Sequence, residues 1–126
     1  MKTLRLDLDC KYALSNFMDR IWIIKYLGLH VVKVKVHHTV NGFHVRLLCE
    51  NEVEPLKAIL FQSLLGDDFK RALCNLLRFE RGSKRWNPMF KRKWATDKLG
   101  QEIQVSQETY DKELSKKVFH LIQLGE

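Results

Sequence analysis

The stretch Val31–Glu50, VVKVKVHHTVNGFHVRLLCE, decides the fold of this chain. Two runs of alternating apolar and polar residues flank Asn41-Gly42, and both central residues of a type I′ turn need the positive φ that Asn and Gly tolerate. The pattern therefore predicts a β-hairpin with a two-residue loop, in which Val40 lies opposite Phe43. One face is predicted to be apolar, with Val32, Val34, Val36, Val45, Leu47 and Cys49. The other face is predicted to be polar and mostly basic, with Lys33, Lys35, His37, Thr39, His44, Arg46 and Glu50.

The residues before this hairpin predict a strand and then a helix. Leucines alternate with polar residues over Thr3–Asp9, which is typical of a half-buried strand. From Tyr12 to Leu27 the apolar residues follow helical spacing, and Gly28 is a suitable stop at the C-terminal end.

Two helices are predicted after the hairpin. Asn51 and Glu54 match a capping box, and Pro55 fits the first turn of a helix. The spacing predicts that this helix, which ends at Gly66, buries Val53, Leu56, Leu60, Phe61 and Leu64. Asp67 is the expected N-cap of the next helix, which is predicted to bury Phe69, Ala72, Leu73, Leu76 and Leu77.

The composition changes at Arg78–Lys93, RFERGSKRWNPMFKRK, where aromatic residues are interleaved with cations. We expect a strand from about Trp86 to Trp94, at a sheet edge or bulged because it contains a proline. A turn over Thr96–Gly100 and a return strand over Gln101–Val105 follow. Ser106 is the expected cap of a final helix, whose apolar positions are Tyr110, Leu114, Val118, Leu121 and Ile122.

The order of these elements, β-α-β-β-α-α-β-β-α, predicts an α+β fold. It matches a ferredoxin-like or RRM-like antiparallel sheet with helices on one face, extended by a C-terminal β-hairpin and a helix. In that arrangement the first strand lies beside the hairpin strand that follows Asn41-Gly42, so Asp7 and Asp9 share the open face with His44. We expect residues 1–126 to form a single domain.

The charge of the chain points to an anionic partner. The net charge is +7 and the pI is about 9.5, which favours nucleic acid first and a membrane surface second. The three cysteines lack CxxC spacing, which predicts a reduced, intracellular and cytoplasmic protein. The N-terminus has no apolar region of a signal peptide, and no apolar run has the length of a membrane span, so we expect no membrane partner.

Asp7 and Asp9 form the first candidate site. Carboxylates two residues apart on a strand project from the same face, and such a pair can hold Mg²⁺ or Mn²⁺ for phosphoryl transfer. The alternative is a pair of solvated aspartates that balance neighbouring cations.

The run LRLDLD, a helix and then a hairpin containing NGFH resembles the archaeo-eukaryotic primase superfamily over roughly residues 3–50. The resemblance implies an RRM-like core in which Asp7 and Asp9 match the acidic motif and Gly42-Phe43-His44 the small-x-His motif. It also implies a third acidic residue on a later strand, which is not evident in the sequence. The chain therefore also fits a non-catalytic relative that keeps the binding face. In overall character it is similar to small uncharacterised proteins of viruses and plasmids of hyperthermophilic archaea.

The basic and aromatic segment is the second candidate site. Its cations can neutralise phosphates and Trp86 can stack on a base, while the alternative is that the aromatic residues are core and the cations a solvated rim. We predict a nucleic-acid-binding protein that acts in the replication or expression of a small genome. The predicted contacts are Lys33, Lys35, His44, Arg46, Arg81, Lys84, Arg85, Trp86, Lys91, Arg92 and Lys93.

Two other functions remain as alternatives. One is a metal-dependent, primase-like nucleotidyltransferase or its inactive remnant; otherwise we assign no catalytic residue and no cofactor. The other is a protein–protein module, such as a homodimer formed through the final helix, although a helix that packs back on its own sheet explains the same pattern. Adjacent His37 and His38 point to opposite faces of a strand, so they do not predict a zinc site.

Overall fold

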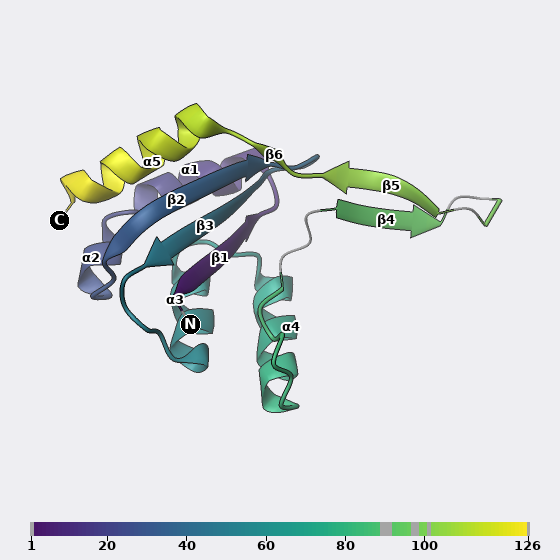
Figure 1. Ribbon diagram of the computed structural model, residues 1–126, viewed down its shortest axis with the longest axis horizontal. Helices are drawn as coiled ribbons and strands as arrows, with labels where there is room; N and C mark the ends of the chain where they lie inside the picture. Colours follow the sequence, from purple (N-terminus) through teal and green to yellow (C-terminus); the bar gives the residue numbers. More distant parts are fainter. Residues whose placement is uncertain (1, 89–91, 97–98, 101, 126) are drawn as a thin grey trace.

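An antiparallel sheet forms the centre of the computed structural model (Figure 1). The structure describes residues 2–88, 92–96, 99–100 and 102–125, with 92–96 and 102–107 described by their backbone. Four strands form the sheet in the order β1-β3-β2-β6, and their bounds are β1 Thr3–Leu8, β2 Val31–His38, β3 Phe43–Cys49 and β6 Thr109–Tyr110. The prediction that the first strand lies beside the second hairpin strand is confirmed.

Helices cover one face of the sheet and one of its edges (Figure 1). The described helices are α1 Lys11–Arg20, α2 Ile23–Tyr26, α3 Pro55–Leu64, α4 Phe69–Glu80 and α5 Lys112–Leu124. Helices α1, α2 and α5 pack on the apolar face, while α3 and α4 lie next to the β1 edge. No helix of the described residues lies on the opposite face, so the predicted α+β class with an open antiparallel sheet is confirmed.

A second sheet consists of β4 (Arg92–Thr96) and β5 (Glu102–Gln107), which pair with each other. This hairpin, called the β4–β5 arm below, projects away from the main sheet (Figure 1). Within the described part of the chain, no helix combines the length and the hydrophobicity that crossing a membrane requires.

The period-2 pattern places the core as predicted. Leu4, Leu6 and Leu8 from β1 are fully buried, and the predicted inward residues of the hairpin are buried with them: Val34, Val36, Val45, Leu47 and Cys49. Phe17 and Ile24 cover these strands from α1 and α2, and α5 contributes Val118 and Ile122. Val32 is an exception, because a bulge between Val31 and Lys33 buries Val31 and exposes Val32.

The loop of the hairpin differs from the prediction. His38 pairs with Phe43, so the loop is Thr39–Gly42 and the register is shifted by two residues. Neither Asn41 nor Gly42 has a positive φ, so the prediction of a type I′ turn is wrong. Thr39 closes the loop, since its N–H donates to the Gly42 carbonyl (2.9 Å) and its Oγ1 accepts from the Gly42 N–H (3.1 Å). A shift of two keeps every side chain on its predicted face, because side chains alternate with period two.

The predicted C-terminal stop of the first helix is confirmed, but the predicted N-caps of α3 and α4 are wrong. The first helix is interrupted after Arg20, and Gly28 ends it with φ 72° as expected. Asn51 does not cap α3; its amide accepts from the His30 N–H (2.7 Å) and donates to the Gly28 carbonyl (3.0 Å), which joins α2 to β2. Asp68, and not Asp67, caps α4.

The elements after α4 also differ from the prediction. The strand begins at Arg92, while Trp86 lies in the preceding loop, buried and edge-on to Phe79. Ser106 belongs to β5, and Asp111 caps α5 by accepting from the Leu114 N–H (2.9 Å).

The predicted inward faces of α3 and α4 are largely wrong. Leu56, Leu60 and Leu64 on α3 are exposed, and so are Phe69, Leu73 and Leu77 on α4. The inward sides mix apolar and polar residues: Ala58, Ile59 and Gln62 of α3 and Asn75 of α4 are buried, and Arg71 is half-buried.

The cause is the free edge of β1, whose backbone groups need partners. Gln62 accepts from the Arg5 N–H (3.0 Å), and Asp67 accepts from the Asp7 N–H (2.7 Å). Arg71 donates to the Arg5 carbonyl (3.0 Å) and to Asp67 (2.9 Å). The helix pair thus replaces a neighbouring strand with side-chain hydrogen bonds.

Candidate functional site

The uncovered face of the sheet carries two polar rows that run across β1, β3 and β2. Arg5 pairs with Arg46 and Arg46 with Lys35, which places three cations side by side. The neighbouring row consists of Asp7, His44 and His37, and Tyr110 of β6 extends it. We call the first of these the cationic row.

Like charges at directly opposite positions of a sheet destabilise it. Burial, and after it the charges of Arg46 and Arg71, lower the pKa of Arg5 below its usual value. The Arg5 guanidinium donates to the Asn87 carbonyl (3.1 Å), and the half-buried Lys35 completes the row. An anion close to these side chains reduces the repulsion within the cationic row, and the Glu108 carboxylate is one such anion, paired with Arg46.

Glu108 contacts both rows, and no sequence pattern predicts it as part of a site. Its carboxylate accepts two hydrogen bonds from Arg46, at 2.9 and 2.6 Å. It also lies 3.3 Å from Nδ1 of His44 and 3.7 Å from Nδ1 of His37. Burial alone would raise the pKa of Glu108, but the hydrogen bonds and charge of Arg46 lower it, so the carboxylate is ionised. Glu108 comes from the end of the β4–β5 arm, and no local pattern marks it.

His44 was predicted on an open face but is 3% exposed. Its Nε2 lies 3.6 Å from Asp7, and its other ring nitrogen faces Glu108. Burial lowers the pKa of His44 although both carboxylates oppose this effect, so the ring is neutral near pH 7. A phosphate cannot reach His44 while these neighbours cover it, which corrects its predicted role as a nucleic-acid contact.

Asp7 and Asp9, the predicted metal ligands, lie in different surroundings. Asp7 is half-buried beside His44, whereas Asp9 is exposed and lies beyond the end of β1. Both line a hollow of about 400 Å³, which Asp67 and Asp68 also line. Among the described residues, no three His, Cys, Asp or Glu side chains are arranged to hold a metal ion.

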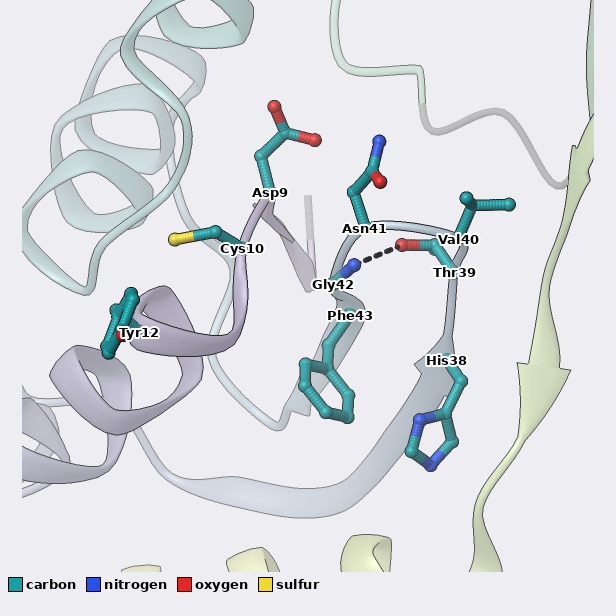
Figure 2. A pocket seen from close by; sticks show the side chains of 9 residues that line it. All are labelled: Asp9, Cys10, Tyr12, His38, Thr39, Val40, Asn41, Gly42 and Phe43. Atoms are coloured by element: carbon teal, nitrogen blue, oxygen red, sulfur yellow. Dashed lines mark hydrogen bonds between the residues drawn. The ribbon is translucent and has the colours of Figure 1, made fainter.

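A second hollow, of about 650 Å³, lies at the β2–β3 loop (Figure 2). Asp9 and Asn41 point to one side of it, while Phe43 and His38 point to the other. His38 is held there by Asp111, whose carboxylate lies 2.6 Å from its Nε2, and its ring lies against Phe43. Asp9 and Cys10 line both hollows.

No protein-family model, curated protein or solved structure matches this chain. The chemistry of the uncovered face therefore has to be inferred from its own residues.

Most of the other residues predicted to contact nucleic acid lie away from the cationic row. Lys33 is exposed on the same face as Lys35. Arg81 ends α4, which points away from the sheet (Figure 1), and the exposed Lys84 and Arg85 follow it. Trp86 is 9% exposed and packs on Phe79, so its ring is not available to a base. Arg92 and Lys93 open β4 as backbone positions, and Lys91 lies outside the described residues.

Proposed function

We propose that this chain binds the phosphate backbone of duplex DNA through the uncovered face of its sheet. The observation that supports this most is the cationic row, in which Arg46 is already paired with Glu108 while Arg5 and Lys35 keep their charge for a phosphate. Phosphates neutralise such a row, and each cation that contacts a phosphate releases a counterion. The net charge of +7 adds a long-range attraction of the same sign.

The uncovered face favours phosphate over base recognition. Proteins that bind single strands stack bases on aromatic side chains. Tyr110 of β6 is an exposed aromatic residue on this face, and its ring lies against His37. The outward positions of β1, β2 and β3 in the described chain add no Phe, Tyr or Trp: Thr3, Arg5, Asp7, Lys33, Lys35, His37, His44, Arg46 and Leu48. We therefore expect binding with little dependence on sequence.

The β4–β5 arm supports a duplex as the partner. It is a two-stranded ribbon that projects from the main sheet, and Glu108 ties its end to the cationic row (Figure 1). The major groove of B-DNA admits a two-stranded β-ribbon, whereas the deep, narrow major groove of A-form RNA does not. Arg92 and Lys93 are the first two residues of β4 in this arm.

We also propose that the β1–α1–β2–β3 part is a reduced ferredoxin-like or RRM-like core. The support is the strand order β1-β3-β2, which a split βαβ unit shares. The edge of β1, where such a fold has its fourth strand, is here occupied by side chains of α3, α4 and the loop between them.

Lys35→Ala tests the proposed function. Measured by fluorescence anisotropy across a salt series, the variant should bind every duplex more weakly and lower the salt slope by about one. Lys116→Ala is the matched control, because it removes the same charge from the solvent side of α5. Equal affinity and slope for wild type and Lys35→Ala, or no binding of wild type at low salt, would reject the proposal.

A primase-like nucleotidyltransferase, or its remnant, is the second candidate. Asp7 and His44 are neighbours, as the resemblance implies, and Glu108 supplies a third carboxylate that the sequence pattern lacks. Arg46 neutralises that carboxylate, so we expect low-millimolar Mg²⁺ or Mn²⁺ to leave the melting temperature unchanged. A metal-dependent rise that Asp7→Asn abolishes would favour this second function.

A further inference from the structure

Helix α4 presents its apolar side to solvent. Its inward positions hold Arg71, Asn75 and Arg78, which join hydrogen bonds with Asn87, the β1 edge and each other. Its outward positions hold Phe69, Leu73 and Leu77, which are 75%, 56% and 39% exposed. Three large apolar residues one helical turn apart form a continuous exposed stripe.

The residues beside this stripe are self-complementary in an antiparallel arrangement. The exposed face of α4 carries Lys70 near its start and Glu80 at its end. When a second α4 runs antiparallel about Asn75, Leu73 of one copy faces Leu77 of the other, and Lys70 faces Glu80. Hydrophobic and ionic contacts thus each form twice, as a two-fold interface requires.

Helix α3 supplies further apolar surface. A standard interface buries about 800 Å² on each partner, which is more than one side of a single helix about 18 Å long offers. α3 packs against α4 and exposes Leu56, Leu60 and Leu64. The two helices of each copy together provide the area for an antiparallel four-helix contact.

We propose that the chain forms a homodimer through this face, with α4 packed antiparallel on α4 of a second copy. The interface lies at the β1 edge, outside the uncovered face of the sheet, so it is independent of the proposed DNA binding.

Leu73→Asp tests whether this face forms the dimer. Leu73 is exposed, so the variant should stay folded by circular dichroism. Sedimentation velocity of wild type should show a dimer, and Leu73→Asp should raise the dissociation constant at least about a hundredfold, because its contact forms twice. Leu124→Asp, at a 68% exposed position on α5, is the control and should leave the dimer intact. A monomeric wild type, or a dimer that survives Leu73→Asp, would overturn the proposal.

A charge swap tests the register. Lys70→Glu and Glu80→Lys each place like charges opposite one another, so each should weaken the dimer about tenfold. The double variant restores opposite charges across the interface and should recover the affinity of wild type. A double variant as weak as either single variant would exclude the antiparallel register.

Discussion

Gly42 lies where the β2–β3 loop passes the end of β1. A Cβ at this position would overlap the Leu8 carbonyl and would lie 2.9 Å from the Cys10 N–H nitrogen. The glycine is therefore required by a close approach of two backbones, since its φ is not positive. The contact holds the end of β1, and with it Asp9, against the loop that lines the second hollow.

We expect Gly42→Ala to lower the free energy of unfolding by about 2–3 kcal/mol, because neither backbone segment can move without breaking strand pairing. Urea denaturation of both proteins measures the change. Gly125→Ala is the control: its nearest new contact would be at an ordinary 3.6 Å, so its stability should match wild type within about 0.5 kcal/mol. A Gly42→Ala variant as stable as that control would contradict the overlap.

At the scale of elements, the α3–α4 pair is organised by the β1 edge rather than by its own apolar stripes. Asn87, in the loop after α4, is 4% exposed and completes the hydrogen bonding. Its side-chain carbonyl accepts from Gln62 (3.2 Å), Arg71 (2.8 Å) and Asn75 (3.0 Å). One amide thus joins α3, α4 and the loop that precedes the β4–β5 arm.

Asn87→Ala should cost about 3 kcal/mol of unfolding free energy, because it leaves several buried donors without an acceptor. Thermal and urea unfolding measure the loss. Asn41→Ala, at an exposed position, should change stability by no more than about 0.5 kcal/mol. If the two variants were equally stable, these hydrogen bonds would not hold the helix pair in place.

At the scale of the whole molecule, the chain forms a packed body, which consists of the main sheet and its helices, and the β4–β5 arm, which projects from it. Among the residues whose side chains are described, the buried apolar ones lie in the main sheet, its helices and the loops that join them. The arm pairs with itself, and Glu108 at its end contacts the cationic row.

Replacing residues 93–106 by a short Gly/Ser linker should leave the body folded, with unfolding free energy within about 1 kcal/mol of wild type. If the arm contributes a phosphate contact to the proposed DNA binding, the affinity for duplex DNA should fall by about tenfold at moderate salt. Urea denaturation and anisotropy titrations measure both quantities. Unchanged affinity would show that the arm takes no part in DNA binding.

The sequence by itself determined β1, β2 and β3 and which of their side chains face the core, whereas β6 contains Tyr110, which was predicted to belong to the final helix. Alternation with period two is a local property, and it survives the two-residue shift of the hairpin register because that shift keeps every face. Lys35 and Arg46 therefore lie on the predicted face, although both are half-buried rather than exposed.

Only the tertiary structure decided the orientation of α3 and α4, the burial of His44 and the position of Glu108. Helical spacing marks an apolar stripe, but it does not show that the unpaired backbone of β1 draws Gln62 and Arg71 inward and leaves that stripe outside. Glu108 reaches Arg46 across 62 residues of sequence, a separation at which no local periodicity carries information. Hydrogen bonds and ion pairs between distant segments form only in the folded chain. In α3 and α4 they decide which side of the helix faces the β1 edge, and the local spacing of apolar residues does not.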